Sequence, residues 1–259
     1  MKGLVRAAGV GERLRPLTYT IPKPLLEIGG RPLIHYPLLM LKRAGVTQIA
    51  INVHHLAGEI EAALGNGSSL GIEITYSREP VLLGTGGALN PLREYFAGET
   101  FIVANGDTIL DLDLSAMVAF HRERKALATL LLARPDNLDD YSRIEIDRDG
   151  RIRRMRLLRR RDPIEYDDYP REPGAKISGA LDAHMFCGLM VAEPEVLGML
   201  PEAAPWSIMT GLLAPMMTGG LPLFGYAYGG YFRTVDDLAS YEALRAEFTS
   251  RSPHLHYLR

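Results

Sequence analysis

Short apolar segments alternate with segments of helical periodicity through the first 135 residues, and this alternation limits the possible folds most strongly. The apolar segments predict buried strands at Gly3–Ala8, Gln48–Val53, Ile72–Tyr76, Thr100–Ala104 and Ala128–Ala133. The periodic segments predict helices at Pro32–Ala44, Ala57–Leu64, Gly87–Phe96 and Leu114–Lys125. Strands that alternate with helices form βαβ units. The sequence therefore predicts an α/β, Rossmann-like fold, with a mixed, mostly parallel sheet flanked by helices.

The pattern changes after residue 135. Arg143–Asp147 and Arg151–Leu158 predict a β-hairpin around Asp149-Gly150. Residues 159–180 are polar and contain three prolines, which predicts a long loop or lid. The expected elements that follow are a strand at Ala183–Val191, helices at Glu193–Leu200 and Trp206–Thr218, and a last helix from about Val235 to Phe248. We expect a single domain, 1–259, in which residues 136–259 form a smaller lobe on the sheet of residues 1–135.

Charge and cysteine content exclude several classes of function. The formal net charge is −2, so no overall positive field attracts nucleic acid or an anionic membrane. The single cysteine, Cys187, excludes an internal disulfide and suits a reducing compartment. No apolar run approaches the roughly 20 residues that span a bilayer, and the apolar stretch near the start is too short for a signal peptide. We therefore expect a cytoplasmic protein whose partners are neither nucleic acid nor membrane.

Residues suited to a nucleotide follow three of the predicted strands, at 7–15, 79–88 and 105–107. In an open parallel sheet, ligands bind beyond the carboxyl ends of the strands, so these segments are expected on one rim. Gly9 and Gly11 leave backbone N–H groups open to oxygen atoms, because no side chain blocks the approach. The glycines of L-G-T-G-G at 83–87 offer a second surface, on which a base or a sugar ring could lie.

Charged residues lie on the same segments. Arg13 and Arg15 supply guanidinium groups that match phosphate geometry, and Lys23 carries a point charge between two prolines. Asp107 follows a buried strand, where a carboxylate could bind Mg²⁺. Each has a plainer explanation, since glycines make turns, lysines lie on surfaces and aspartates cap helices. Their joint occurrence on three successive strand ends favours a nucleotide site.

The stretch A-A-G-V-G-E-R-L-R-P-L-T at 7–18, followed by P-K-P-L at 22–25, resembles the signature of the sugar-1-phosphate nucleotidylyltransferases. Members of this family make nucleotide sugars and pyrophosphate from NTPs and sugar 1-phosphates. The resemblance continues through R-P-L-I-H-Y at 31–36, A-G-V at 44–46, L-G-T-G-G-A-L at 83–89 and N-G-D at 105–107. The L-G-T-G-G-A-L form resembles the branch that contains mannose-1-phosphate and heptose-1-phosphate guanylyltransferases and N-acetylmuramate-1-phosphate uridylyltransferase.

The resemblance implies roles for individual residues. Arg13, Lys23 and Asp107 would be catalytic, with Arg13 stabilising charge at the α-phosphorus, Lys23 neutralising phosphate oxygens and Asp107 holding Mg²⁺. The residues implied for the nucleotide, GTP or UTP by preference, are Ala7, Ala8, Gly9, Gly11, Glu12, Glu79, Gly84, Thr85 and Gly86. Asn105 and Gly188 would lie beside the sugar 1-phosphate. Residues 1–135 would then bind the nucleotide and residues 136–259 the sugar.

The chain departs from the family pattern near its end. The family's second Mg²⁺ ligand is an aspartate in a segment like W-x-D-V-G-T-P, and Thr234 takes that position here. Asp236 lies two residues further on and could face the same side, provided that the chain bends toward the ion. We therefore expect Asp107 and Asp236 as the metal ligands.

Four further features leave alternatives open. Seven arginines at 151–161 stand where the family often has a Glu-Lys-Pro that serves the sugar. They predict a solvated hairpin face or, less favoured, a site for phosphate, a polyanion or a partner. Arg6 is unusual in a buried strand, and should either pair with a carboxylate or point into the nucleotide cleft. His54 and His55 either touch ligand or serve the strand end. Cys187 is expected to act as a small apolar residue.

Two functions follow from these residues. The first is an active nucleotidylyltransferase that makes an NDP-sugar with Mg²⁺. The alternative is a catalytically weakened relative that binds nucleotide sugar as a sensor or regulatory subunit, which Thr234 and the missing Glu-Lys-Pro would favour. The sequence leaves the sugar and the base open, and a homo-oligomer is compatible with either function.

Overall fold

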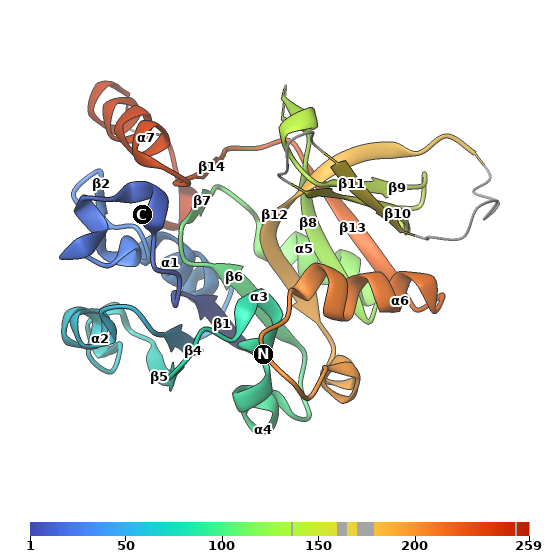
Figure 1. Cartoon of the computed structure of the whole chain (residues 1–259), viewed down its shortest axis with the longest axis horizontal. Helices are drawn as coiled ribbons and strands as arrows, with labels where there is room; N and C mark the ends of the chain where they lie inside the picture. The colour runs from blue at the N-terminus through green and yellow to red at the C-terminus, as the bar shows by residue number, and fades with distance from the viewer. Residues whose placement is uncertain (136, 160–164, 170–178, 252, 259) are drawn as a thin grey trace.

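Within the described residues, the fold is built on a ten-stranded mixed sheet (Figure 1). We analysed a computed structural model, which describes residues 1–135, 137–159, 165–169, 179–251 and 253–258. One half of the sheet is parallel, in the order β6-β1-β4-β5. Its strands are β1 (Lys2–Arg6), β4 (Gln48–Val53), β5 (Glu73–Arg78) and β6 (Phe101–Asn105). Helices α1 (His35–Arg43) and α2 (Ala57–Leu64) connect the first three strands, which confirms the predicted βαβ units.

The second half of the chain extends the same sheet. Strand β12 (Asp182–Ala192) pairs antiparallel with β6, and also with β8 and β9. The remaining strands are β8 (Ala128–Ala133), β9 (Arg143–Ile146), β10 (Ile152–Arg159), β11 (Glu165–Tyr169) and β13 (Leu223–Tyr228). Strands β9 and β10 form the predicted hairpin, in which Gly150 has a φ of +82°. The expected fold class is confirmed, and every antiparallel pair within the ten-stranded sheet of the described residues involves β10 or β12.

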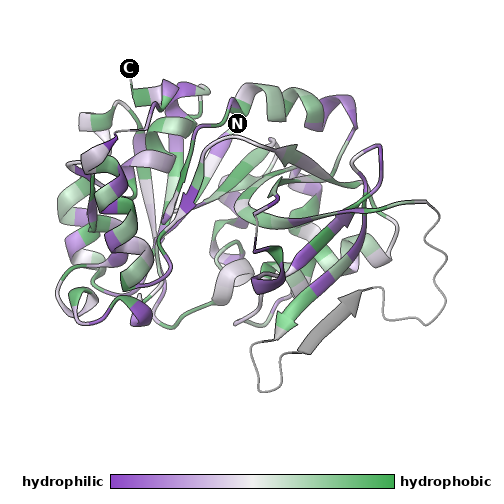
Figure 2. Ribbon diagram, turned by 90° about the horizontal axis from the view of Figure 1, so that it is seen from above, coloured by the Kyte–Doolittle hydropathy of each residue, from purple (hydrophilic) through white to green (hydrophobic). Residues whose placement is uncertain are grey.

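Two apolar cores lie on the two faces of the sheet. Side chains of a strand alternate between faces, and neighbouring residues accordingly fall in different cores: Val5 in one and Leu4 in the other, Ile51 in one and Ala50 in the other. Figure 2 shows the molecule from above, with helices beside the sheet and apolar residues along the strands. None of the helices in the described part of the chain is long and apolar enough to cross a membrane.

The C-terminal helix returns to the N-terminal half of the molecule (Figure 1). Strand β14 (Phe232–Thr234) pairs antiparallel with β7 (Thr108–Leu110), and α7 (Leu238–Ser250) follows it. The ring of Phe248 contacts that of Tyr36 edge-on, with 5.7 Å between centroids. A small hairpin of β2 (Glu27–Ile28) and β3 (Arg31–Pro32) lies beneath α7. This return brings residues 232–240 close to the end of β6.

Several predicted elements differ from the structure. The helix expected at Gly87–Phe96 is broken into α3 (Gly84–Gly87), a 3₁₀ turn Asn90–Leu92 and α4 (Arg93–Phe96), because Pro91 lacks an N–H and obstructs the preceding turn. The helix expected at Trp206–Thr218 begins only at Met209, with a π-turn Met209–Leu213 before α6 (Ala214–Thr218). The short helix expected at Glu193–Leu200 is a 3₁₀ helix, Pro194–Met199.

The segment 159–180 is not wholly a loop, since β11 within it pairs with β10. Residues 160–164 and 170–178, the rest of the expected lid, lie outside the described residues. Helix α5 (Leu114–Glu123) matches its prediction closely, and α7 begins at Leu238, three residues later than expected. Strands β7, β13 and β14 were not predicted; β7 and β14 have only three residues each, too few for a periodic pattern.

Candidate functional site

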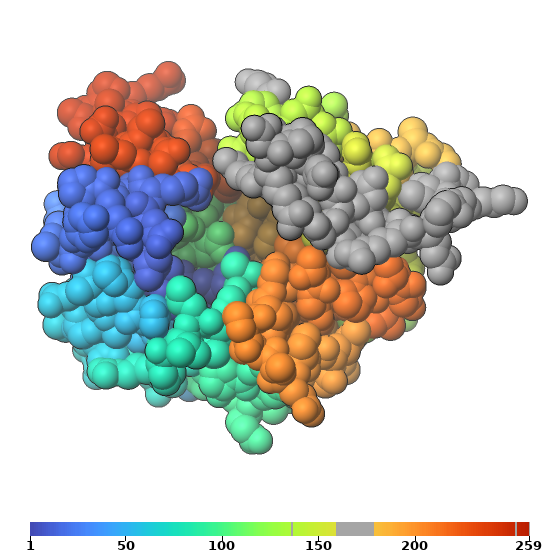
Figure 3. Space-filling view, in the orientation of Figure 1, coloured from blue at the N-terminus to red at the C-terminus, as the bar shows by residue number. Residues whose placement is uncertain are grey.

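A cavity of about 400 Å³ opens at the carboxyl ends of β1 and β6. Its described lining comes from four separate parts of the chain: Arg6, Ala7 and 9–13; Lys23 and Pro24; Gly106 and Asp107; and Asp236. The space-filling view is hollowed between the N-terminal segment, in blue, and the second half of the chain (Figure 3). This is the rim on which the sequence predicts a nucleotide.

The first glycine loop forms one wall of the cavity. Gly11 has a φ of +65°, a conformation that glycine adopts without strain, and it precedes the 3₁₀ turn Glu12–Leu14. A Cβ at Gly11 would lie 2.9 Å from Cγ2 of Thr18, whereas a Cβ at Gly9 would meet no atom within 4 Å. Gly11 is therefore required by the turn, and Gly9 leaves the backbone open to the cavity.

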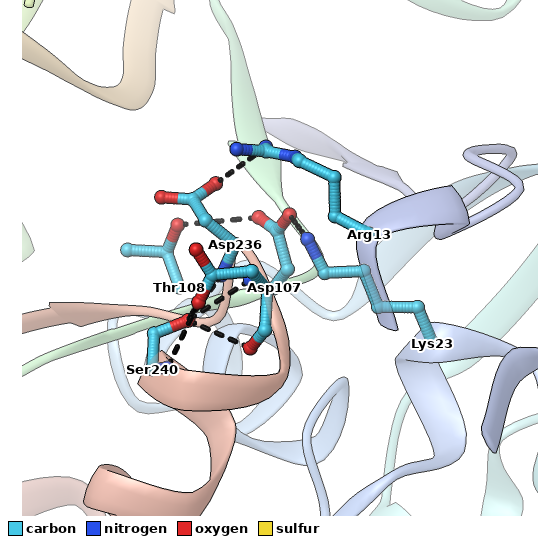
Figure 4. A network of polar contacts seen from close by, with 7 residues as sticks. Arg13, Lys23, Asp107, Thr108, Asp236 and Ser240 are labelled. Atoms are coloured by element: carbon cyan, nitrogen blue, oxygen red, sulfur yellow. Dashed lines mark hydrogen bonds and ion pairs between the residues drawn. The ribbon is translucent and has the colours of Figure 1, made fainter. Parts of the chain in front are cut away.

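Two ion pairs face the cavity (Figure 4). Nζ of Lys23 contacts Oδ2 of Asp107, and Nη2 of Arg13 lies 3.3 Å from Oδ1 of Asp236. The first pair is largely enclosed, with Lys23 only 14% exposed, whereas the Arg13 side chain is 60% exposed. Thr108 Oγ1 donates to the other oxygen of Asp107 at 3.4 Å. The structure thus brings together four residues that the sequence predicts as catalytic or metal-binding.

A bend after β14 places Asp236 in the cavity. Thr234 ends the strand opposite Thr108, and the N–H of Val235 donates to the carbonyl of Asp107 at 3.1 Å. The backbone then leaves the strand direction, and the N–H of Asp236 donates to Oγ of Ser240 at 3.0 Å. The condition on which the sequence argument for Asp236 depended, a bend toward the site, is met. Thr234 lines an adjoining hollow that also includes Arg13 and Asp236.

The second glycine loop is shaped by Trp206. A Cβ at Gly86 would lie 2.1 Å from the Trp206 ring, and one at Gly84 would lie 2.5 Å from its carbonyl oxygen. The carbonyl of Trp206 accepts from the N–H of Gly86 at 3.1 Å, and Oγ1 of Thr85 accepts from the N–H of Ile208 at 3.1 Å. Packing against Trp206 therefore requires glycine at both positions, in addition to the ligand role that the sequence predicts for them.

Glu79 is a buried connector between the two glycine loops. The residue is only 4% exposed. One carboxylate oxygen accepts from Nδ2 of Asn52 at 2.7 Å, and the other accepts from the N–H of Leu83 at 2.9 Å. Oδ1 of Asn52 in turn accepts from the N–H of Ala7 at 2.9 Å. Sequence reasoning missed Asn52, although a polar residue in the apolar strand β4 was a visible sign.

Arg6 lines the cavity, which agrees with one of its two predicted alternatives, and no carboxylate among the described residues forms an ion pair with it. Its Nη1 donates to the carbonyl of Thr85 at 2.9 Å, and its Nη2 donates to Oδ1 of Asn105. Gly188, with a φ of +78°, allows β12 to approach Asn105, because a Cβ there would lie 2.3 Å from Nδ2 of that residue. The two residues predicted for the sugar side, Asn105 and Gly188, are therefore in contact.

The histidines and the cysteine have structural surroundings. Nδ1 of His54 lies 2.7 Å from the carbonyl oxygen of Glu79, and Nε2 of His55 lies 2.8 Å from that of Thr18. A carbonyl only accepts, so these ring nitrogens carry protons. Cys187 is 2% exposed, and burial raises the pKa of its thiol to about 12, which leaves little reactive thiolate at neutral pH.

Three of the arginines of 151–161 donate hydrogen bonds to acceptors among the described residues. Arg153 donates to Asp147 at 2.7 Å, Arg154 donates to Glu145 at 2.8 Å, and Arg151 donates to the carbonyl of Gly220 at 2.6 Å. These contacts agree with the predicted solvated face. Residues 160 and 161 lie outside the described part of the chain.

Two carboxylates are the candidate ligands for a divalent cation. Within the described residues, no cluster of three or more histidine, cysteine or acidic side chains could hold a metal ion. Asp107 and Asp236 nevertheless line the same cavity. Mg²⁺ commonly binds through one or two carboxylates and completes its shell with water and substrate phosphates. The donor set therefore fits Mg²⁺ that arrives with a phosphate ligand.

Comparison with known proteins gives consistent results. The family model described as "Nucleotidyl transferase" matches residues 2–156. The chain is 33% identical to the UTP–glucose-1-phosphate uridylyltransferase of Synechocystis over 249 residues, which are 91% of this chain and 60% of that protein. It is 49% identical to the N-acetylmuramate alpha-1-phosphate uridylyltransferase of Neisseria meningitidis over 117 residues, 45% of this chain and 51% of that protein. The chain thus spans little more than half the length of these relatives.

Solved structures share the fold at lower sequence identity. HddC from Yersinia pseudotuberculosis superposes with a TM-score of 0.73 at 22% identity, over 95% of this chain and 99% of that one. The inositol-1-phosphate CTP transferase from T. maritima superposes with a TM-score of 0.70 at 20% identity, over 98% of each chain. At these identities the likeness concerns the fold alone.

Proposed function

Because the chain belongs to the nucleotidyl transferase family, we propose that it transfers a nucleotidyl group from an NTP to a sugar 1-phosphate, giving an NDP-sugar and pyrophosphate. One observation carries the proposal: Arg13, Lys23, Asp107 and Asp236 converge on one cavity beside an open glycine loop. These are two phosphate-binding cations and two Mg²⁺-binding carboxylates, the groups that phosphoryl chemistry needs.

The proposed reaction needs no general base. An oxygen of the sugar phosphate, already ionised at neutral pH, attacks the α-phosphorus of the NTP. The new P–O bond forms as the bond to the bridging oxygen of the β-phosphate breaks, and pyrophosphate leaves. Ala7, Ala8, Gly9, Gly11 and Glu12 form the wall for the triphosphate, and the cations beside them hold it in line.

Arg13 and Lys23 supply the charge stabilisation in this scheme. Arg13 is exposed enough to turn from Asp236 to a phosphate, and its guanidinium matches phosphate oxygens in pairs. Lys23 lies against Asp107, where it can neutralise phosphate oxygens of both substrates. Asp107 and Asp236 would hold Mg²⁺, which when bound offsets negative charge on the phosphate oxygens.

The second glycine loop and the end of β6 are the proposed contacts of the base and the sugar. The base would lie against Gly84, Thr85 and Gly86, with Glu79 holding that loop, since both of its carboxylate oxygens are already occupied. Asn105 and Gly188 would face the sugar. GTP or UTP is the favoured donor, because relatives include uridylyltransferases and mannose-1-phosphate guanylyltransferases. Their names lend no support to a sensor or regulatory subunit. A cytoplasmic location and self-association are part of the same proposal.

A pyrophosphate-release assay tests the activity. The protein is incubated with Mg²⁺, each NTP and a panel of sugar 1-phosphates, and Asp107→Asn is expected to abolish any release. Asp149→Asn, the same change on a surface turn far from the cavity, is the matched control and should leave release unchanged. Release that survives Asp107→Asn would refute the metal assignment.

Binding is measured separately through Trp206, the single tryptophan of the sequence. Because Trp206 packs on Gly86, a base that binds this loop should change its fluorescence. A fluorescence change without pyrophosphate release from any pair would reject the enzyme and favour a binding protein. Release without a fluorescence change would instead reject the assignment of the base to this loop.

A further inference from the structure

Arg6 lines the cavity from the end of a central strand. It is the last residue of β1, which pairs with β4 on one side and β6 on the other. Its guanidinium lines the same cavity as Arg13 and Lys23. Through Thr85 and Asn105 it touches the segments that follow β5 and β6. Arg6 therefore lies between the loop proposed for the base and the residues proposed for the sugar.

Among the described residues, Arg6 lacks the carboxylate partner that Arg13 and Lys23 each have. Lys23 and Arg13 each contact a carboxylate, whereas Arg6 donates to two uncharged oxygens, the carbonyl of Thr85 and Oδ1 of Asn105. Within the part of the chain that the structure describes, no carboxylate forms an ion pair with it; Asp107 acts on it only through the longer-range attraction. Arg6 is half-buried, and a partly desolvated cation without a carboxylate partner is unfavourable. An anionic ligand would remove that cost.

Arg6 remains a cation despite its surroundings. Burial lowers its pKa to about 10, and the charge of Asp107 opposes that shift. At neutral pH the guanidinium is therefore protonated. It has five N–H donors, of which two have acceptors in the structure. Donors remain for a ligand in the cavity.

We propose that Arg6 binds a phosphoryl group of a substrate, as a third cation of the site beside Arg13 and Lys23. The proposal deepens the function proposed above and rests on it. Arg13 and Lys23 must leave a carboxylate before they can bind phosphate, whereas Arg6 needs no such exchange. Arg6 is therefore expected to be the strongest phosphate-binding residue when no metal is present. The phosphoryl group belongs either to the NTP or to the sugar 1-phosphate.

Calorimetric titration with inorganic phosphate in EDTA tests the proposal without turnover. Arg6→Leu should lower the affinity for phosphate by about tenfold or more, a typical loss for a charged hydrogen-bond pair. Arg6→Lys should retain part of it. Arg78→Leu, which removes an exposed arginine paired with Glu61, is the matched control and should have no effect. Unchanged phosphate affinity in Arg6→Leu would overturn the proposal.

If Arg6 has only a structural role, a different result is expected. If Arg6 only ties the two segments together, then Asn105→Ala, which removes one tie and keeps the charge, should weaken phosphate binding as Arg6→Leu does. If Arg6 binds phosphate, Asn105→Ala should cost much less. Should Arg6→Leu fail to fold, Arg6→Lys and Asn105→Ala still separate the two cases, since lysine keeps the charge but not the forked geometry.

Two further titrations identify the source of the phosphoryl group. One uses UTP and GTP, and the other uses mannose 1-phosphate and glucose 1-phosphate, each with Arg6→Leu and the unaltered protein. A selective loss for the nucleotides assigns the contact to the NTP, and a selective loss for the sugar phosphates assigns it to the acceptor. Phosphate binding that depends on Arg6 in a protein that releases no pyrophosphate would support the site and reject the enzyme.

Discussion

Gly86 is a residue at which packing, rather than backbone conformation, excludes a side chain. Gly86→Ala should destabilise the protein by about 1–3 kcal/mol, because the added Cβ would lie 2.1 Å from the Trp206 ring and one of them must move. Urea unfolding measures the change. Gly9→Ala is the control, since its Cβ would meet no atom within 4 Å, and it should change the free energy of unfolding by less than about 0.5 kcal/mol. Equal effects would show that the Trp206 contact is not the cause.

Single residues were predictable where a motif carries them. Arg13, Lys23, Asp107 and Asp236 were named from the sequence, and all four line one cavity. The packing reason for Gly86 was not predictable, because Trp206 lies 120 positions away in the sequence and its contact depends on the tertiary fold. Asn52 was missed for the same reason: its importance comes from two partners, Ala7 and Glu79, that only the folded chain brings to it.

The start of helix α7 determines where Asp236 lies. Asp237 caps the helix, with its carboxylate accepting from the N–H of Ser240 at 2.9 Å. Asp237→Ala should cost about 1 kcal/mol of stability, as losses of N-caps do, and it should also weaken nucleotide binding in Mg²⁺ by loosening Asp236. Asp237→Asn, which can still accept the hydrogen bond, is the control. Loss of stability without any effect on binding would separate the cap from the site.

The Asp237 cap also has a pH dependence of known sign. Hydrogen bonds from Ser240 lower the pKa of Asp237 below its ordinary value of 3.8. The stability that the charged form adds is therefore present above pH 3.8 and is lost as the pH falls through the lowered pKa. Urea unfolding between pH 7 and pH 3 should show the unaltered protein converging on Asp237→Asn. A difference that stays constant from pH 7 to pH 3 would contradict this.

A second pH dependence comes from the contact of α5 with the sheet. His121 is 1% exposed, with Nδ1 2.8 Å from Thr129 and Nε2 2.9 Å from Glu193. Burial lowers the pKa of His121 below 6.5, although Glu193 opposes the shift. The imidazole then binds a proton more readily in the unfolded chain than in the folded protein. The free energy of unfolding should therefore be highest above pH 6.5 and should decrease as the pH falls below 6.5. In urea unfolding, His121→Gln should reduce the change of unfolding free energy with pH. If the pH dependence is unchanged in this variant, another group causes it.

The elements with a clear period were predicted well, and the irregular ones were not. Helix α2 and strands β4 and β8 match their predicted bounds, because each has an uninterrupted pattern. Pro91 interrupts a predicted helix because it lacks an N–H and obstructs the preceding turn, and the spacing of apolar residues does not show this effect. The antiparallel entry of β12 beside β6 depends on the order of strands in the sheet, which no single segment specifies.

At the scale of the whole molecule, the cavity depends on contacts between distant parts of the chain. Arg13 and Asp236 are 223 positions apart, and Lys23 and Asp107 are 84 apart. In the free protein two of the proposed phosphate-binding cations, Arg13 and Lys23, are each paired with a proposed Mg²⁺ ligand. A metal ion or a triphosphate that binds alone must therefore break an ion pair without replacing both partners. Together they satisfy all four groups, so we expect the two ligands to bind cooperatively.

Linkage requires that each ligand raise the affinity for the other by the same factor, for which about tenfold is a reasonable expectation. Calorimetric titration of UTP or GTP, in EDTA and in Mg²⁺, measures that factor. Asp236→Asn frees Arg13, so it should strengthen binding of the metal-free nucleotide and reduce the gain that Mg²⁺ brings; the exposed pair itself should contribute less than about 1 kcal/mol to folding. Asp149→Asn should leave both affinities unchanged. If Asp236→Asn instead weakened metal-free binding, Asp236 would not compete with phosphate for Arg13, and the proposed exchange of partners would be wrong.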